Sequence, residues 1–186
     1  MTENFKEYSR DLIPPASGAQ SLRTEFEFHI EPMCEHDLIE VIEIEEVSRL
    51  SPWGWEAYHS QLMQGAMMQV ARLTNSHAAP DLESGYSLLG YIAARSIINE
   101  IHINNIAVRP ECRCHGVASA LLRRTFDLAK HAGMVSAFLE VRSSNHEAQM
   151  LYYKFGFQLV GTRYNYYHEP VEDALVMKAE ITRLDC

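Results

Sequence analysis

The segment from residue 100 to residue 133 predicts a strand, a tight turn and a helix in immediate succession. Residues 101–108 are rich in β-branched side chains, and Pro110 ends the strand because proline has no N–H to donate to a ladder. After the turn, apolar residues recur at the spacing of one helix face until Gly133 supplies a stop. A strand that feeds directly into a helix restricts this part of the chain to the crossover unit of an α/β sheet.

The turn itself, residues 113–118, has the pattern R-x-x-G-x-A. Gly116 and Ala118 have little or no side chain, so a ligand can approach the backbone there. The first turn of a helix also offers unpaired N–H groups and a positive dipole end, which suit an anion such as phosphate. A plain strand-to-helix turn that happens to contain glycine has the same pattern, so the turn alone leaves both interpretations open.

The length and composition fit one globular domain. The chain has 186 residues, 47% of them hydrophobic and 22% charged. A chain of this length can bury a hydrophobic core without disulfides or metals to stabilise it. Residues 1–24 show no apolar period and contain the break Pro14-Pro15, so we expect a flexible N-terminal arm there. We expect residues 25–186 to form the single folded domain.

Other features argue against several classes of function. No stretch approaches the ~20 apolar residues of a membrane span and the N-terminus lacks a secretory signal, so we expect a cytoplasmic protein with no membrane partner. A net charge of −9 argues against nucleic acid as a partner, since that needs clustered Lys and Arg. The cysteines match neither a disulfide framework nor zinc spacing, so we expect reduced thiols and no metal; they are Cys34, Cys112, Cys114 and Cys186.

Acidic residues are concentrated between positions 25 and 60, where Arg49 is the one Lys or Arg. A solvated helix face is the ordinary interpretation of such a run. The alternative is a field that attracts a cationic substrate, in which case this segment and the loop with Trp53 and Trp55 line a peptide groove and high salt raises the KM. The acidic residues are Glu25, Glu27, Glu31, Glu35, Asp37, Glu40, Glu43, Glu45, Glu46 and Glu56.

Periodicity along the rest of the chain predicts alternating strands and helices. Ser144 begins an S-x-x-E capping box, which predicts a helix start at that residue. The mixed order implies an α/β sheet with helices on both faces. The remaining predicted elements are strands over 25–31, 67–73, 86–98, 135–141, 157–167 and 174–181, and helices over 35–50 and around Tyr58.

Four ordered motifs carry a resemblance to a known family. With them the chain resembles the GNAT acetyltransferases, and within these the RimI-like ribosomal-protein alanine N-acetyltransferases, over residues 25–181. One small departure is Ala118, which stands where many members have glycine. The motifs are N-I-A-V at 105–108 with R-C-H-G-V-A at 113–118, L-E-V-R-S-S-N at 139–145, A-Q-M-L-Y-Y-K-F-G-F at 148–157, and G-T-R-Y-N-Y-Y at 161–167 with E-D-A at 172–174.

The resemblance implies a mixed, mostly antiparallel twisted sheet with helices on both faces, and acetyl-CoA as co-substrate without a metal. It implies that the strand end binds the pantetheine arm and that the turn wraps the pyrophosphate. Asn145 stands at the position of a cofactor-contacting asparagine, although a helix cap explains it as well. The implied cofactor residues are Ile106, Ala107, Val108, Arg113, Cys114, His115, Gly116, Val117, Ala118, Ser119 and Asn145.

The resemblance also implies two catalytic residues. Glu140 is the candidate general base, because alternation along its strand turns it away from the apolar face and holds it against the sheet. A carboxylate paired with Arg142 or His102 is the structural alternative. Tyr152 is the candidate general acid for the leaving thiolate, and a hydrogen-bonded core tyrosine is its alternative.

Together these residues predict direct acetyl transfer from acetyl-CoA to the α-amine of a protein N-terminus, a ribosomal protein being one candidate. We expect no acyl-enzyme, because Cys112 and Cys114 lie on the pyrophosphate side. Two alternatives stay open: acetylation of a small amine or a lysine side chain, and an acyl-CoA-binding module without catalysis. The sequence leaves undecided whether the protein is a monomer or a homodimer, and whether Tyr164, Tyr166 and Tyr167 contact substrate.

Overall fold

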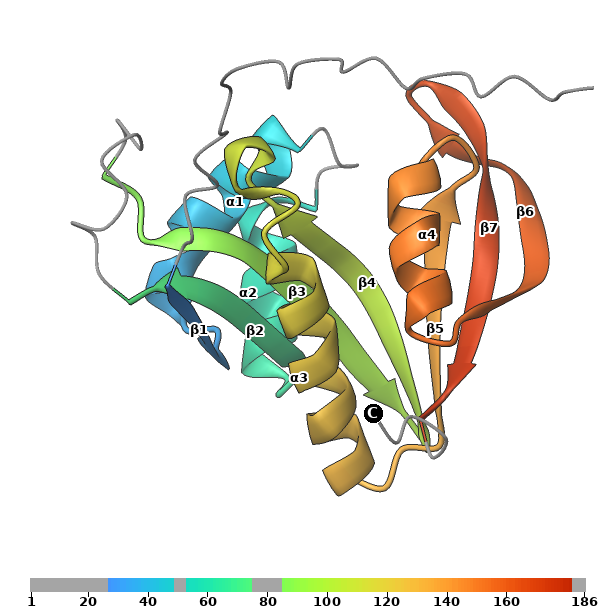
Figure 1. Cartoon of the computed structure of the whole chain (residues 1–186), viewed down its shortest axis with the longest axis horizontal. Helices are drawn as coiled ribbons and strands as arrows, with labels where there is room; N and C mark the ends of the chain where they lie inside the picture. Colours follow the sequence, from blue (N-terminus) through green and yellow to red (C-terminus); the bar gives the residue numbers. More distant parts are fainter. Residues whose placement is uncertain (1–26, 49–52, 75–84, 182–186) are drawn as a thin grey trace, which may run out of the picture.

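The computed structural model describes residues 27–48, 53–74 and 85–181 (Figure 1). Within them the predicted order of strands and helices is confirmed, with boundary shifts of a few residues. The predicted arm, residues 1–24, lies outside the described residues. The elements are β1 Phe28–Pro32, α1 Leu38–Val47, α2 Gly54–Met63, β2 Met67–Leu73, β3 Leu88–Ile97, β4 Glu100–Val108, α3 Val117–His131, β5 Ser136–Arg142, α4 His146–Lys154, β6 Gln158–His168 and β7 Val171–Glu180.

The strands form one sheet in the order β1-β2-β3-β4-β5-β7-β6. Among the described strands, β4 and β5 form the one parallel pair, and every other neighbouring pair is antiparallel. The predicted mixed, mostly antiparallel sheet is therefore confirmed. The chain crosses from β4 to β5 through α3, as a parallel connection requires.

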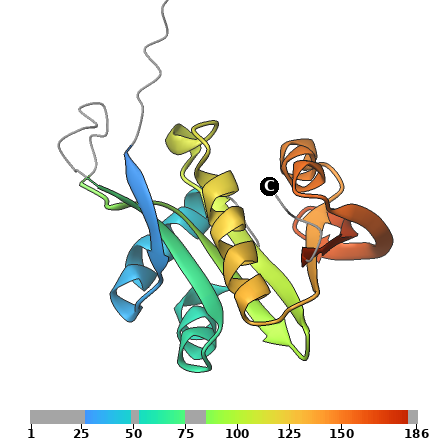
Figure 2. The same ribbon diagram turned by 60° about the horizontal axis from the view of Figure 1, so that its bottom comes forward.

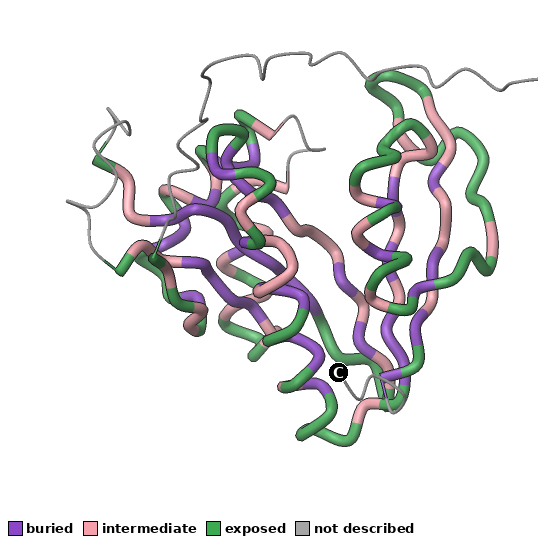
Figure 3. Tube along the Cα trace, viewed as in Figure 1, coloured by how far each residue is buried: buried purple, intermediate pink, exposed green. Residues whose placement is uncertain are grey.

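Helices cover both faces of the sheet, as predicted (Figure 2). One apolar core lies beneath α3 and α4 and includes Leu121 and Phe157. The other lies beneath α1 and α2 and includes Leu38 and Tyr58. Burial is densest in β3, where the residues from Leu88 to Ala94 are all buried (Figure 3). None of the described helices is long and apolar enough to span a membrane.

A fork between β4 and β5 is the feature of the sheet that matters for function. The two strands pair from Glu100↔Ser136 to Ile103↔Leu139 and then separate, as Figure 1 shows. On its other edge β4 stays paired with β3, where a register shift leaves Asn104 as an extra residue. Gly90 of β3 permits this close pairing, because a Cβ there would lie 2.5 Å from the carbonyl oxygen of Ala107.

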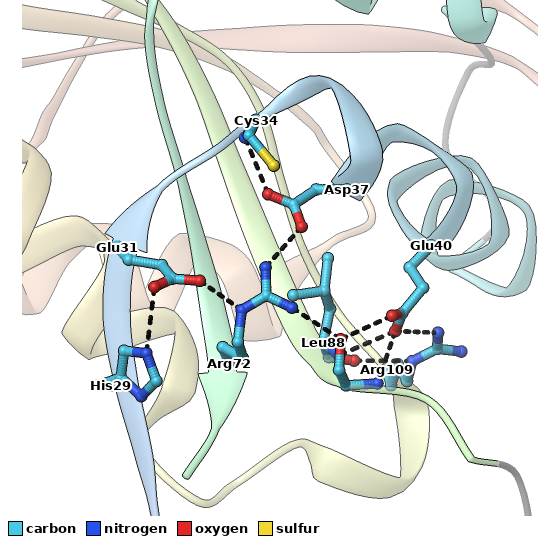
Figure 4. Close-up of polar contacts among 9 residues, drawn as sticks. His29, Glu31, Cys34, Asp37, Glu40, Arg72, Leu88 and Arg109 are labelled. Atoms are coloured by element: carbon cyan, nitrogen blue, oxygen red, sulfur yellow. Dashed lines mark hydrogen bonds and ion pairs between the residues drawn. The ribbon is translucent and has the colours of Figure 1, made fainter.

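The acidic segment binds α1 to the sheet (Figure 4). Glu40 accepts hydrogen bonds from the backbone N–H groups of Ser87 and Leu88, at 2.9 and 2.8 Å, and contacts the guanidinium of Arg109. Asp37 and Glu31 both pair with Arg72. Because these carboxylates have partners within the fold, the interpretation of this segment as a solvated helix face is wrong for them.

Candidate active site

The fork opens into a cleft of about 1270 Å³. Its walls are the end of β4, the turn and first residues of α3, the end of β5, one side of α4 and the end of β6. All but one of the candidate site residues from the sequence line it. Those that do are Ile106, Ala107, Val108, Arg113, Cys114, Gly116, Val117, Ala118, Ser119, Glu140, Asn145 and Tyr152.

The β4 wall exposes backbone groups to the cleft. Residues 104–108 have no pairing partner among the described residues of β5, so the peptide groups on that edge of β4 are open. An edge of this kind can hydrogen-bond an extended amide-containing chain as if it were another strand. Ile106, Ala107 and Val108, predicted to bind a pantetheine arm, lie along it.

The turn before α3 has the geometry of an anion site. Gly116 has a φ of 83° and precedes the first helical residue, and Cys114 also has a positive φ of 62°. The N–H groups of Val117, Ala118 and Ser119 are in the first turn of α3, where no intrahelical acceptor exists. These donors and the helix dipole favour a phosphate group at this end of the cleft.

Two side chains fix the turn in place. Arg113 donates from Nε to the carbonyl oxygen of Val108 at 3.2 Å, which connects the turn to the end of β4. The imidazole of His115 lies 2.6 Å from the carbonyl oxygen of Arg113. His115 is the candidate cofactor residue that does not line the cleft.

Asn145 caps α4, as one of its sequence interpretations held, and it also lines the cleft, so its contact with the cofactor stays a prediction. Its Oδ1 accepts from the N–H of Ala148 at 3.1 Å. The predicted helix start at Ser144 is wrong by one residue. The N–H of Ser144 instead donates to the carboxylate of Glu172 at 2.5 Å, which leaves the cap to Asn145.

Glu140 lies at the mouth of the fork, directly after the last paired residue of β5. Its side chain is 28% exposed, and its carboxylate lies 3.2 Å from the guanidinium of Arg163 on β6. The structural alternative, in which Glu140 pairs with Arg142 or His102, is therefore wrong about the partner. In the sheet, β6 is separated from β5 only by β7. The sequence did not predict this strand order, so it did not predict Arg163 as the partner.

Tyr152 is buried, with 6% of its surface exposed, and its ring packs edge-on against Phe157. Burial raises the pKa of its phenol, and the nearby Tyr167 adds to that rise. No described residue accepts a hydrogen bond from the Tyr152 hydroxyl, in contrast to the hydrogen-bonded core tyrosine of the structural alternative. The hydroxyl therefore stays protonated and is available to a ligand in the cleft.

Glu140 and Tyr152 lie on opposite sides of the sheet. Leu139 and Val141 point into the core that contains Tyr152, so Glu140 between them projects to the side of α1 and α2. A thioester in the fork would therefore have a proton acceptor on one side and a proton donor on the other. That division suits the two proton transfers of an acyl transfer to an amine.

A group of contacts that sequence reasoning missed joins the end of β5 to the β6–β7 hairpin. Arg142 donates to Glu172 and to the carbonyl oxygens of Glu169 and Pro170, and its guanidinium lies 4.0 Å from the ring centroid of Tyr167. This arginine and Glu172 form what we name the Arg142–Glu172 clasp. Burial raises the pKa of Tyr167 to about 12. No local sequence pattern marks the clasp, because its halves are 30 residues apart.

The sequence left open which aromatic residues contact substrate, and the structure places some of them in the cleft and others outside it. Trp53, Tyr166 and Tyr167 line the cleft. Tyr164 is 79% exposed outside it, and Trp55 stacks on His59. None of the described acidic residues before position 60 lines the cleft, so the predicted acidic groove is wrong for that part of the chain.

Comparison with known proteins gives the family. A sequence model described as the acetyltransferase (GNAT) family matches residues 38–157. The chain belongs to the GNAT acetyltransferase family. It is an acetyl-CoA-dependent N-acetyltransferase, as the motifs in β4, β5 and α4 predicted.

Its relatives lie in the predicted branch of this GNAT family. A Haemophilus influenzae protein named ribosomal protein bS18-alanine N-acetyltransferase is 30% identical over 144 residues, which cover 76% of this chain and 90% of the relative. A Bacillus subtilis protein carries the same name, marked as a provisional assignment, and is 36% identical over 141 residues, which cover 76% of this chain and 87% of the relative. The crystal structure of the Escherichia coli ribosomal-protein-S18-alanine N-acetyltransferase superposes with a TM-score of 0.72 at 25% identity, covering 83% and 94%.

Proposed function

We propose that this GNAT enzyme transfers the acetyl group of acetyl-CoA to the α-amine of a protein N-terminus, and that its substrate is a ribosomal protein that begins with alanine. The names of its relatives support the substrate class. The observation that carries the proposal is the fork, with Glu140 on one side of the sheet and Tyr152 on the other. We propose a reaction in the cytoplasm, because ribosomal proteins are made there.

In this proposal acetyl-CoA enters between β4 and β5. The open edge at Ile106, Ala107 and Val108 binds the pantetheine arm, and residues 113–119 bind the pyrophosphate at the start of α3. Asn145 contacts the cofactor from the start of α4. His115 supports the turn through its contact with the Arg113 carbonyl rather than by facing the cleft.

The acceptor amine approaches from the side of α1 and α2. Glu140 takes a proton from the amine, directly or through water, and the nitrogen forms a bond to the thioester carbonyl carbon. The tetrahedral intermediate then collapses, the carbon–sulfur bond breaks, and the sulfur leaves as the thiolate of CoA. Tyr152 gives its hydroxyl proton to that thiolate. The pair with Arg163, whose side chain is 57% exposed, is weak enough to leave the Glu140 carboxylate available.

The transfer needs no acyl-enzyme. Burial raises the pKa of the Cys112 thiol, which disfavours the reactive thiolate. Cys112 and Cys114 lie in the turn before α3, at the end of the cleft proposed for the pyrophosphate. Direct attack therefore fits the arrangement of the side chains better than a cysteine intermediate does.

A panel of acceptors tests the proposal. Thiol release from acetyl-CoA is measured with peptides that begin with Ala, Ser, Thr or Met, with an N-terminally blocked lysine peptide, and with spermidine. We expect turnover with free N-termini and a preference for alanine. Turnover on the lysine peptide or spermidine alone would overturn the substrate class, and tight acetyl-CoA binding without turnover on any amine would overturn the catalytic assignment.

A further inference from the structure

A group of hydrogen-bonded side chains from α1, α2, β3 and β4 lies on the α1/α2 side of the cleft. It consists of Glu45, Tyr58, Tyr91 and Asn105, and we name it the Asn105 network. We infer that this network turns the side-chain oxygen of Asn105 toward the acceptor and that this oxygen binds the attacking amine. The inference rests on the proposed acetyl transfer to an amine and adds a binding residue to it.

Glu45 is the fixed point of the network. It is a carboxylate with 1% of its surface exposed, and it accepts from the N–H groups of Trp53 and Gly54 at 2.9 and 3.3 Å. It also accepts from the hydroxyl of Tyr58 at 2.7 Å. In this contact the Tyr58 hydroxyl is the donor and the Glu45 carboxylate is the acceptor.

The donor role of Tyr58 fixes the rest of the network. Its single proton is committed to Glu45, so its oxygen must accept from Tyr91 and from Asn105, each at 2.7 Å. Burial raises the pKa of both tyrosines, which keeps both hydroxyls protonated. The atom of Asn105 that faces Tyr58 must therefore be the Nδ2 donor, and Oδ1 points the other way.

The side-chain oxygen of Asn105, Oδ1, is a hydrogen-bond acceptor without a donor. No described residue donates to Asn105 Oδ1, and this atom is not among the fully buried unpaired atoms of the described chain. Asn105 lines the cleft just beyond Ile103, the last residue of β4 that pairs with β5. Glu140 stands at the same point of the fork on β5 and projects to the same side of the sheet.

An attacking amine supplies the missing donor. It carries N–H groups as ammonium, as free amine and in the tetrahedral intermediate, and its nitrogen becomes more positive as the bond to carbon forms. An acceptor oxygen held in advance at that nitrogen favours the transition state without reorganisation. Glu140 then removes one proton while Asn105 holds another N–H group. In this division Asn105 binds the amine, and Tyr58, Tyr91 and Glu45 are positioning residues.

The test compares Asn105→Ala and Tyr58→Phe with the wild type. We expect Asn105→Ala to lower kcat/KM for the acceptor about 10- to 100-fold, the range for one hydrogen bond to a charged group, with the Kd for CoA changed less than about twofold. Tyr58→Phe should give a smaller loss, because Asn105 keeps its oxygen but loses its anchor. Asn99→Ala, in the exposed turn between β3 and β4, and Tyr153→Phe, exposed on α4, are the matched controls and should behave as wild type.

An unchanged kcat/KM in Asn105→Ala overturns the inference, and so does a loss of CoA affinity that matches the loss of kcat/KM. If Asn105→Ala does not fold, as judged by thermal unfolding, Tyr58→Phe decides by the same two readouts. The assay uses whichever amine of the acceptor panel the wild type acetylates. Failure on N-terminal peptides therefore counts against the proposed substrate alone, whereas an unaffected Asn105→Ala variant counts against the amine-binding role alone. A wild type that acetylates no amine overturns both.

Discussion

The two walls of the cleft are built in different ways. The β4 wall is packed between two cores and held by buried polar groups, among them Glu45 and Arg109, which are 1% and 6% exposed. The opposite wall ends in β6, which has no buried residue along its length. Figure 3 shows this contrast in the coloured tube. The Arg142–Glu172 clasp connects that outer hairpin to the start of α4.

The difference suggests a division of work. A wall fixed by the core holds groups that must not move, such as the backbone edge for the cofactor and the amide of Asn105. A hairpin with exposed side chains can change without loss of the fold, so it suits recognition of the acceptor beyond its amine.

The largest effect is expected at Tyr152, a buried residue of α4 in the wall opposite β4. Tyr152→Phe should lower kcat about 100-fold or more, because proton transfer to the thiolate is lost while packing is kept. Steady-state kinetics and the Kd for CoA measure this. Tyr153→Phe, one residue along α4 and 48% exposed, is the control. Equal effects in the two variants would remove the assigned role of Tyr152.

A smaller effect, on stability, is expected when a glycine in each wall is replaced by alanine, which adds one methyl group. Gly90→Ala places a Cβ 2.5 Å from the Ala107 carbonyl oxygen and should destabilise the protein by about 1–3 kcal/mol. Gly161→Ala in β6 meets Val176 at 4.0 Å, so it should be neutral or slightly stabilising. Urea unfolding measures both. Similar destabilisation by the two variants would contradict the contrast between the walls.

The clasp predicts a dependence of stability on pH. The N–H of Ser144, and further hydrogen bonds, lower the pKa of Glu172 from 4.5 to about 2. Because the folded-state pKa is the lower one, this carboxylate stabilises the fold above pH 4.5, and that contribution is lost as the pH falls toward 2. The stability difference between wild type and Glu172→Gln should therefore shrink from pH 6 to pH 2.5, as measured by urea unfolding. A constant difference would argue against the clasp.

The smallest effect is expected from salt. Glu31 and Asp37 pair with Arg72, and Glu40 and Glu43 pair with Arg109. None of these acids lines the cleft, so the pairs weaken their field at the acceptor. Raising NaCl from 50 to 500 mM should change the acceptor KM less than about threefold. A steep rise of the KM would restore the acidic groove that the sequence suggested.

Local patterns were enough to predict much of the molecule. The β-branched run before Pro110, the glycine turn and the amphipathic helix after it predicted the strand, turn and helix that the structure contains. The alternation around Glu140 correctly placed its side chain away from Leu139 and Val141.

The contacts missed by sequence reasoning join residues far apart in the chain. Tyr58 meets Tyr91 across 33 residues and Asn105 across 47, and Glu140 meets Arg163 because β7 lies between β5 and β6. Periodicity reports which face a residue occupies, and it carries no information about which partner arrives from another element. Asp37 and Glu40, read from the sequence as part of a charged surface, pair with two distant arginines.

The most direct test of the account is a single-turnover measurement on Glu140→Gln. Enzyme saturated with acetyl-CoA is mixed with a peptide that begins with alanine, and acetylation is followed across pH 6–10, with Glu46→Gln on the exposed side of α1 as the control. We predict wild-type affinity for CoA with transfer slowed about 100-fold or more, and partial recovery at high pH where the peptide amine is already deprotonated. Transfer at the wild-type rate at neutral pH would contradict the claim that Glu140 accepts the proton of the amine.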